Sequence, residues 1–264
     1  MKIENEGSGE MKVIKGVTQF TYQQLQCCLF PAIIVMSLGI TKYISIGTIP
    51  RYDVLLFICI MTQLALLYFK LETKDELKVI MLFHIIGLVL EIYKVQYGSW
   101  SYPDAGFWKI GGVPLYSGFM YSSIGSYICK AWKVFDLKMS NWPNTKAVIL
   151  LCSFIYLNFF THHFMVDIRW GLIGLVFCLF YPTWVYFTVG DSRLKMPLSL
   201  SFLCIAFFIW VAENIASFFG AWAYPDQLKQ WRLVHLGKIT SWYLLIIISI
   251  MIVAQLKMTK KEIK

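Results

Sequence analysis

Apolar runs of about 20 residues recur along the chain and are separated by short polar connections. A helix of about 20 apolar residues crosses the roughly 30 Å hydrocarbon core of a bilayer, and a helix satisfies its own backbone hydrogen bonds there. The pattern therefore predicts an all-α bundle of eight transmembrane helices in a single integral membrane domain covering residues 1–264. We expect the spans near residues 23–41, 52–70, 77–97, 113–132, 147–165, 168–188, 197–219 and 236–256.

Composition and charge agree with a membrane protein and argue against a soluble domain or a nucleic-acid-binding protein. The 264 residues are 58% hydrophobic and 15% charged, whereas soluble domains carry about 25% charged residues. Eight spans put both termini on one side, and most of the 24 Lys and Arg residues fall on that side. The positive-inside rule then predicts a cell-membrane protein with both termini cytoplasmic. The net charge of +9 is thus a signal for topology and lipid headgroups. Membrane lipids are the expected partners, and nucleic acid is not. The first fifteen residues contain little to bury and are expected to form a flexible tail.

One unusual phrase occurs twice. Residues 91–104 read E-x6-G-S-W-S-Y-P-D, and residues 213–226 read E-x6-G-A-W-A-Y-P-D, at a constant offset of 213 − 91 = 122 residues. This predicts two parallel pseudo-repeats, about 20–135 and 146–258, related by an axis along the membrane normal. Sites in such proteins lie near the interface of the repeats, so we expect both turns to face one site on the outer side of the membrane.

Glu91 and Glu213 are the main candidates for chemistry. Each precedes the glycine of its turn by seven residues and lies about 10 Å inside the helix end. A charge there costs on the order of 3 kcal/mol, so each carboxylate needs a partner, a water-filled cavity or a proton. A protonated carboxyl could serve as acid and its counterpart as base. His84, two turns deeper than Glu91, is a candidate proton relay, with an interhelical hydrogen bond as the alternative. For Glu91 the structural alternative is an ion pair with Lys94.

The aromatic residues of the two turns, with one polar neighbour, are candidates for substrate binding. Alternation in an extended turn places both rings of that turn on one side, where they could stabilise a cation. Anchoring at the membrane interface is the alternative. Asn214 follows Glu213 directly, and a helix–helix hydrogen bond is its alternative role. These candidates are Trp100, Tyr102, Trp222, Tyr224 and Asn214.

A further polar group, His162, His163, Asp167 and Arg169, falls on the same predicted outer face. Its nitrogen and oxygen atoms raise the question of a divalent metal, but no H-x-x-H or H-E-x-x-H spacing occurs. We expect neither metal nor cofactor. The group is interpreted as a substrate-binding polar network, with Arg169 paired to Asp167 or to a lipid phosphate.

Several specific motifs resemble a known family. The two phrases, residues 161–170 (THHFMVDIRW), 196–201 (MPLSLS) and 210–214 (WVAEN), are similar to those of the YoaT-like family of uncharacterised bacterial integral membrane proteins. This resemblance covers nearly the whole chain and implies a membrane protein without implying an activity. Glu91, Gly98, Tyr102, Asp104 and Gly112–Leu115 also resemble a stretch of about 25 residues in membrane carotenoid hydratases and cyclases. That local similarity implies protonation of an isoprenoid double bond.

These observations favour a multi-pass membrane protein with an outer-leaflet site for a lipid-like or isoprenoid-like small molecule. Acid–base catalysis by the membrane carboxylates is part of this hypothesis. Two alternatives stay open from the sequence. One is a proton-coupled transporter of small molecules, and the other is a structural membrane protein without catalysis, so the sequence does not decide whether the chain is an enzyme.

Overall fold

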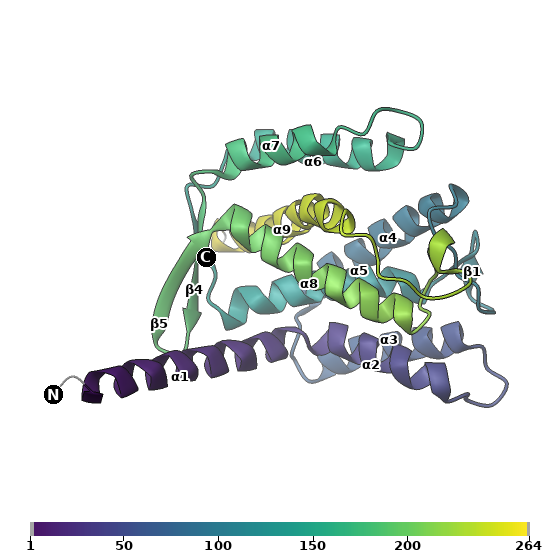
Figure 1. Cartoon of the computed structure of the whole chain (residues 1–264), viewed down its shortest axis with the longest axis horizontal. Coiled ribbons are helices and arrows are strands. Elements are labelled where there is room, and N and C mark those ends of the chain that lie inside the picture. The colour runs from purple at the N-terminus through teal and green to yellow at the C-terminus, as the bar shows by residue number, and fades with distance from the viewer. Residues whose placement is uncertain (1–2, 263–264) are drawn as a thin grey trace.

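The computed structural model describes the backbone of residues 3–262 and the side chains of residues 13–256. Figure 1 shows a helical protein with short strands at its two ends. Its helices are α1 (Ile3–Cys27), α2 (Leu29–Tyr43), α3 (Arg51–Tyr68), α4 (Lys74–Gln96), α5 (Tyr116–Val134), α6 (Thr145–Thr161), α7 (Arg169–Phe180), α8 (Leu198–Phe218) and α9 (Lys238–Glu262), with a 3-10 turn η1 (Pro225–Gln227). The strands are β1 (Lys109–Ile110), β2 (Val113–Pro114), β3 (Lys138–Ser140), β4 (Trp184–Val189) and β5 (Ser192–Pro197).

Two small antiparallel sheets correct the all-α prediction. β1 pairs with β2, and β3, β4 and β5 form a second sheet in that order. The predicted span at 168–188 is wrong beyond Phe180, because Trp184–Val189 forms β4. Pro182 has no N–H to continue the helical hydrogen bonds, and the residues of β4 are aromatic or β-branched, which suits a strand. Gly190, with φ of 56°, starts the two-residue turn into β5.

Helices of membrane-spanning length and composition are confirmed for part of the predicted set. Within the described residues, four helices are long and apolar enough to cross a membrane, namely α3, α4, α8 and α9. A fifth span results if α1 and α2 count as one, but they are bent by 72° near Cys28. Pro31 lacks the N–H that would continue the helical ladder at this point. α6 and α7 are shorter apolar helices, so eight crossings stay a prediction.

The amino-terminal segment is helical along its described length. Backbone helix α1 begins at Ile3 and continues without interruption to Cys27. α1 contains no proline, and a helix that is already nucleated extends at the cost of one residue at a time. The flexibility expected for residues 1–15 stays a prediction, and residues 1–2 lie outside the described part.

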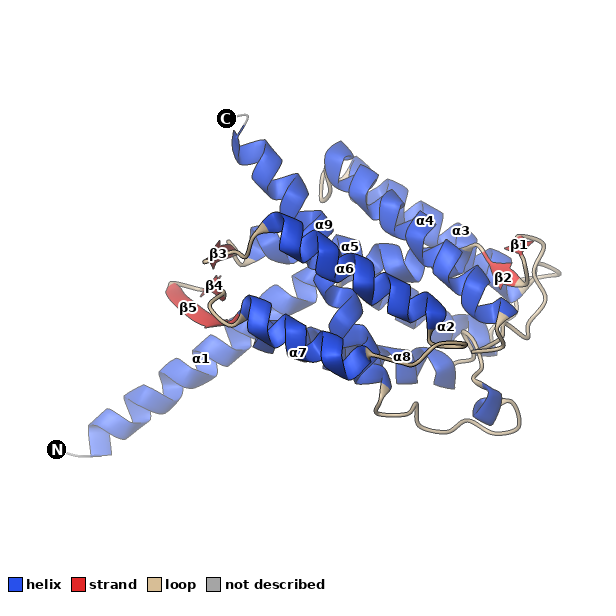
Figure 2. Cartoon of the chain, turned by 90° about the horizontal axis from the view of Figure 1, so that it is seen from above, coloured by secondary structure: helices blue, strands red, loops and turns tan. Residues whose placement is uncertain are grey.

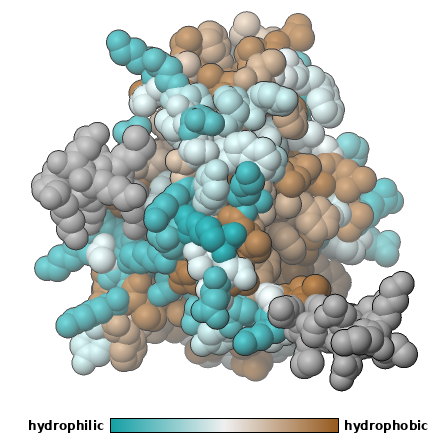
Figure 3. Space-filling model, turned by 90° about the vertical axis from the view of Figure 1, so that its left-hand side faces the viewer, coloured by the Kyte–Doolittle hydropathy of each residue, from teal (hydrophilic) through white to brown (hydrophobic). Residues whose placement is uncertain are grey.

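The helices form three layers, seen in Figure 1. α6 and α7 lie on one side, α4, α5, α8 and α9 in the middle, and α1, α2 and α3 on the other side. The turns that follow α4 and α8 share one end of the molecule with β1 and β2, and both termini lie toward the opposite end (Figure 2). Figure 3 shows that hydrophilic side chains gather over that opposite end, beside apolar ones. The chain therefore places the two repeated phrases together, far from its termini.

Close packing of α4 against α5 holds one half of this end in place. Gly87 has no room for a side chain, because a Cβ there would lie 2.4 Å from the Tyr121 ring. Gly87→Ala is expected to destabilise the protein by about 1–3 kcal/mol, since the Tyr121 ring must move. Gly174→Ala in α7 is the matched control, because its Cβ would meet no atom within 4 Å. The midpoint of unfolding in detergent measures both variants, and equal midpoints would contradict the packing argument.

Candidate functional site

The two repeated turns pair directly with each other. Ser101 and Ala223 form an isolated antiparallel bridge, with N–H to O distances of 2.9 Å in both directions. Gly98 and Gly220 follow the two helices with φ of 66° and 72°, a left-handed conformation that glycine adopts without strain. The prediction that the turns face one another is therefore confirmed.

Glu91 lies at the end of α4 and is 4% exposed. Its Oε2 accepts hydrogen bonds from Trp100 Nε1 at 2.6 Å and from the Tyr102 hydroxyl at 2.7 Å. Its Oε1 accepts one from the Tyr121 hydroxyl of α5 at 2.8 Å. Both rings of the first turn thus point to the same carboxylate, as the alternation predicted. A carboxylate accepts hydrogen bonds at both oxygens and suits a site built only of donors.

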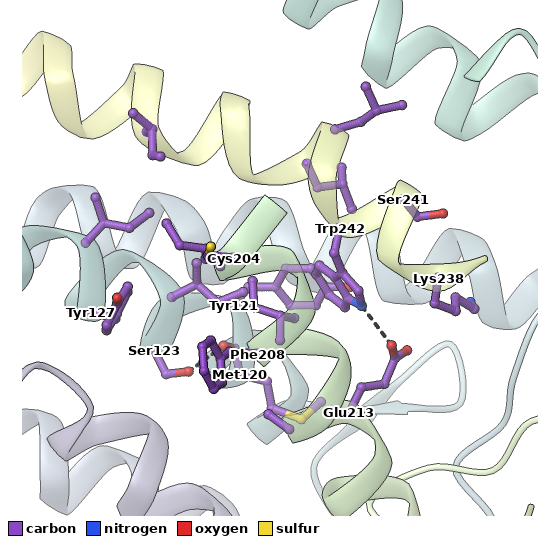
Figure 4. A pocket seen from close by; sticks show the side chains of 18 of the residues that line it. Met120, Tyr121, Ser123, Tyr127, Cys204, Phe208, Glu213, Lys238, Ser241 and Trp242 are labelled. Carbon is purple, nitrogen blue, oxygen red and sulfur yellow. Dashed lines mark hydrogen bonds between the residues drawn. The ribbon is translucent and has the colours of Figure 1, made fainter. Parts of the chain in front are cut away.

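Glu213 has a related but different set of partners. It is 5% exposed, and its Oε1 accepts a short hydrogen bond from the Tyr224 hydroxyl. Its Oε2 accepts a hydrogen bond from Trp242 Nε1 at 2.7 Å, drawn in Figure 4. Trp242 comes from α9 and lies outside the repeated phrase, and Trp222 lines the adjoining cavity. The duplicated phrase therefore builds one asymmetric site.

Lys238 connects the two carboxylates through their aromatic partners. Its ammonium lies 4.8 Å from the centre of the Trp100 ring and 4.5 Å from that of Tyr224. These rings meet edge to face at 5.9 Å, and each donates its hydrogen bond to a different glutamate. The cation expected at the aromatic turns is therefore the chain's own Lys238. Sequence reasoning missed its role, together with those of Tyr121 and Trp242, since none belongs to the repeated phrase.

Lys94 does not pair with Glu91, so that structural alternative is wrong. The Lys94 side chain is 2% exposed and donates to the Phe159 carbonyl at 2.7 Å, near the end of α6. Its Nζ also lies 2.9 Å from His163 Nε2 and 3.5 Å from His162 Nε2. The carbonyls at a helix carboxyl end attract a cation, and neutral imidazole nitrogens accept its remaining protons. This contact brings His162 and His163 to the end of α4.

The imidazoles of His162 and His163 beside Lys94 predict that the folded protein loses stability in acid. Burial and then the Lys94 ammonium lower the pKa of His163, which lies in the loop after α6 and stacks on Tyr97. A lowered folded-state pKa gives stability that is present above the ordinary value of about 6.5 and is lost as the pH falls through the folded value. The unfolding temperature should therefore fall between pH 7.5 and pH 5.

The variant His163→Gln tests this origin, because glutamine does not take up a proton in this range. The groups that face the imidazole are Lys94, Tyr93, Tyr97, Ser99 and His162, with Lys238 acting from further away. We expect a flatter pH profile in the variant. A profile identical to that of the unmodified protein would assign the effect to another group.

Asp167 and Arg169 form the polar network expected of them. Arg169 Nε lies 2.5 Å from Asp167 Oδ2, and the Arg169 guanidinium also donates to Ser241 of α9 at 3.3 Å. Asn158 of α6 donates to Asp167 Oδ1 at 3.0 Å. Although partial burial opposes it, the hydrogen bonds from Asn158 and Arg169 hold the pKa of Asp167 below its usual value. Across the described residues, no three His, Cys, Asp or Glu side chains are grouped as metal ligands.

Two predicted site residues lie elsewhere. The His84 ring packs on Phe119 at 4.5 Å and against Gly118 of α5, so the structure does not bring it to Glu91 as a relay. Asn214 donates to the Trp210 carbonyl at 2.8 Å and accepts from the Val234 N–H at 2.8 Å. Asn214 thereby fixes the loop before α9, which is a positioning contact and not a ligand contact.

A cavity of about 1280 Å³ adjoins the two glutamates. Its polar end is lined by Glu91, Glu213, Trp100, Tyr224, His162, Asp167, Arg169 and Lys238. From there it continues between α5, α8 and α9 past apolar side chains such as Met120, Phe208 and Leu245, and it reaches Phe187 of β4 at the other end of the molecule. Figure 4 shows Tyr121, Cys204 and Trp242 along this space. The arrangement joins one polar end to a long apolar passage.

Fold and site together define a helical protein with several helices of membrane-spanning length and a partly open amphipathic cavity. The chain belongs to the family described as "Protein of unknown function (DUF817)", whose model matches residues 16–250. It is 56% identical over 252 residues to the "Uncharacterized protein YoaT" of Bacillus subtilis (strain 168), covering 96% of each chain. The predicted YoaT-like family is thus confirmed. A crystal structure of a cross-linked MvINS trimer aligns with a TM-score of 0.46 and 13% identity over 69% of this chain and 93% of that one, which is too low to support an argument.

Proposed function

We propose that this protein is a multi-pass membrane protein that binds a lipid-like amphiphile in this partly open cavity. The cavity that joins a polar end to a long apolar passage carries this proposal. Ligand pockets commonly measure about 300–1,000 Å³ and are mostly apolar with a few placed polar groups. A cavity of about 1280 Å³ suits a molecule with a long hydrocarbon chain.

The charge distribution supports an orientation for the site. The termini and the β3–β5 sheet lie at one end, and the repeated turns lie at the other (Figures 1 and 2). Lys138, Arg193 and Lys195 belong to the sheet end, which agrees with a cytoplasmic position under the positive-inside rule. In the proposed topology both termini are cytoplasmic, and the polar end of the cavity lies toward the outer leaflet of the cell membrane.

Ligand binding is favoured over proton transfer because both carboxylates already accept hydrogen bonds from the protein. Glu91 and Glu213 accept hydrogen bonds on both oxygens, from side chains held by neighbouring helices and turns. Groups fixed in this way orient a bound polar group, whereas a catalytic acid needs a free path for its proton. Acid–base chemistry by these residues stays a prediction, and lipid profiles of cells carrying Glu213→Gln would test it.

Photocrosslinking tests the binding site directly. The probe is octadecanol with a diazirine in its alkyl chain, added to the protein in lipid nanodiscs. We expect crosslinks to cavity residues Ser123, Tyr127 and Cys204, and loss of these crosslinks on competition with unlabelled octadecanol. Labelling confined to exposed apolar residues such as Phe57 and Leu64 of α3 would contradict the proposal.

A pair of cysteine variants provides the matched control. Both side chains are exposed, but Cys204 of α8 lines the cavity and Cys178 of α7 does not. Cys204→Trp fills the passage and should reduce cavity crosslinking at least about tenfold, while Cys178→Trp adds the same bulk on the outer surface. An equal effect of the two variants would show that the labelling does not report on the cavity.

A further inference from the structure

The charged side chains that line the cavity balance. Among the described lining residues there are three acidic groups, Glu91, Asp167 and Glu213, and three basic groups, Lys94, Arg169 and Lys238. All six lie at the polar end, at the ends of α4 and α8, in the loop before α7, and at the starts of α7 and α9. Histidine is counted as neutral at pH 7, as in the formal net charge of the whole chain. The formal charge of the polar end is therefore 3 − 3 = 0.

Each of these charges already has partners within the protein. Glu91 accepts three hydrogen bonds and Glu213 accepts two. Asp167 pairs with Arg169, Lys94 is held by a carbonyl and two imidazoles, and Lys238 lies on two aromatic rings. A charged headgroup would either leave one unit of charge unbalanced beside the buried side chains of Glu91, Glu213 and Lys94 or break an existing pair. Either outcome is unfavourable, because an unpaired charge is costly where water is scarce.

The polar end keeps hydrogen-bonding capacity of both kinds. A carboxylate offers about four lone-pair positions, of which Glu213 uses two in the contacts described. The Lys238 ammonium carries three N–H donors and contacts two ring faces. A hydroxyl group can donate to Glu213 and accept from Lys238 without bringing a charge. An ether of the same length can only accept, a hydrocarbon does neither, and an ammonium or a carboxylate adds a charge. Shape, charge balance and the paired donor and acceptor thus point to the same kind of headgroup.

We infer that the cavity takes an uncharged amphiphile with a hydroxyl headgroup, placed beside Glu213 and Lys238, and with its chain along α5, α8 and α9. This inference rests on the proposed binding function and names the class of its ligand. Long-chain alcohols, isoprenoid alcohols and hydroxyl-bearing glycerides share this chemistry.

Competition against the octadecanol photoprobe at pH 7.5 tests the headgroup. The competitors have the same C18 chain and differ only at the end: octadecanol, its methyl ether, octadecanoate and octadecyltrimethylammonium. Octadecanol should compete at least about tenfold better than the other three, which corresponds to about 1.4 kcal/mol. Stronger competition by either ion, or equal competition by the ether, would overturn the inference while leaving the binding site intact. Failure of the photoprobe to label the cavity would instead contradict the proposed function.

Variants that change the charge of the polar end should change which charged competitor binds better. Lys238→Met leaves the polar end with one negative charge, and the trimethylammonium competitor should gain at least about tenfold relative to octadecanoate. Glu213→Gln leaves one positive charge and should produce the opposite shift. The double variant restores the balance and with it the preference for octadecanol over both ions. Unchanged order of the two ions in folded single variants would contradict the charge argument.

Two further variants control for charge outside the site. Lys195→Met in β5 and Asp191→Asn in the β4–β5 turn change the charge of the protein by the same amounts, on residues that do not line the cavity. Neither should shift the order of competitors. A shift there equal to that of Lys238→Met or Glu213→Gln would assign the effect to the surface of the protein and overturn the inference.

Discussion

Arg51→Met is expected to destabilise the protein by about 3–5 kcal/mol, the cost of breaking a largely buried charged network. Arg51 is the first residue of α3, and its side chain is 13% exposed. It donates to the carbonyls of Phe219 and Gly220 at 2.7 and 2.9 Å, and to that of Leu38 at 3.0 Å. It also pairs with Asp104 at 3.1 Å. One side chain thus joins α2, the turn that follows α8 and the first repeated turn.

Lysine should not replace this function, because a single ammonium cannot reproduce the planar fork of donors. We therefore expect Arg51→Lys to lose most of the same stability. Arg193→Met is the matched control, since the Arg193 side chain is 34% exposed and pairs with an exposed Asp136. An exposed pair contributes about 0–1 kcal/mol. Unfolding midpoints in SDS titration measure all three variants, and a small effect at Arg51 would show that the carbonyls find other donors.

Glu91→Gln is expected to destabilise the protein by about 2–3 kcal/mol, more than Glu213→Gln. The carboxylate of Glu91 accepts from Trp100, Tyr102 and Tyr121, all of which are donors. A glutamine side chain has one acceptor oxygen, and its NH₂ group would face at least one of these donors. Hydrogen bonds to a charged group contribute about 1.5–3 kcal/mol, and a buried unsatisfied donor adds to the loss. Glu213 accepts from two donors, so its variant loses less.

Asp191→Asn in the exposed β4–β5 turn is the control for removal of one negative charge. It should leave the unfolding midpoint within about 0.5 kcal/mol of the unmodified protein. The comparison uses thermal and SDS unfolding at pH 7.5. Equal midpoints for Glu91→Gln and Asp191→Asn would show that the three donors do not depend on a carboxylate.

The helices and the pairing of the turns were predictable from sequence because their signals are local or repeated. Apolar runs located α3, α4, α8 and α9, which the structure confirms as helices of membrane-spanning length. The matching phrases predicted that two turns face one another, and Ser101 and Ala223 pair directly. Alternation placed Trp100 and Tyr102 on one side, and both contact Glu91. The β4–β5 hairpin was missed because its apolar residues fit a buried helix as well as a strand.

Sequence by itself determined which residues are costly to bury in this protein, namely two carboxylates inside apolar helices. Only the tertiary structure decided how each is compensated. Lys238 lies 238 − 91 = 147 residues after Glu91 and reaches it through Trp100, whereas Lys94, three residues away, turns to His163. Spacing along a helix fixes which side chains can approach each other. The contacts they make depend on which donors the neighbouring helices bring, and that depends on packing across the whole chain.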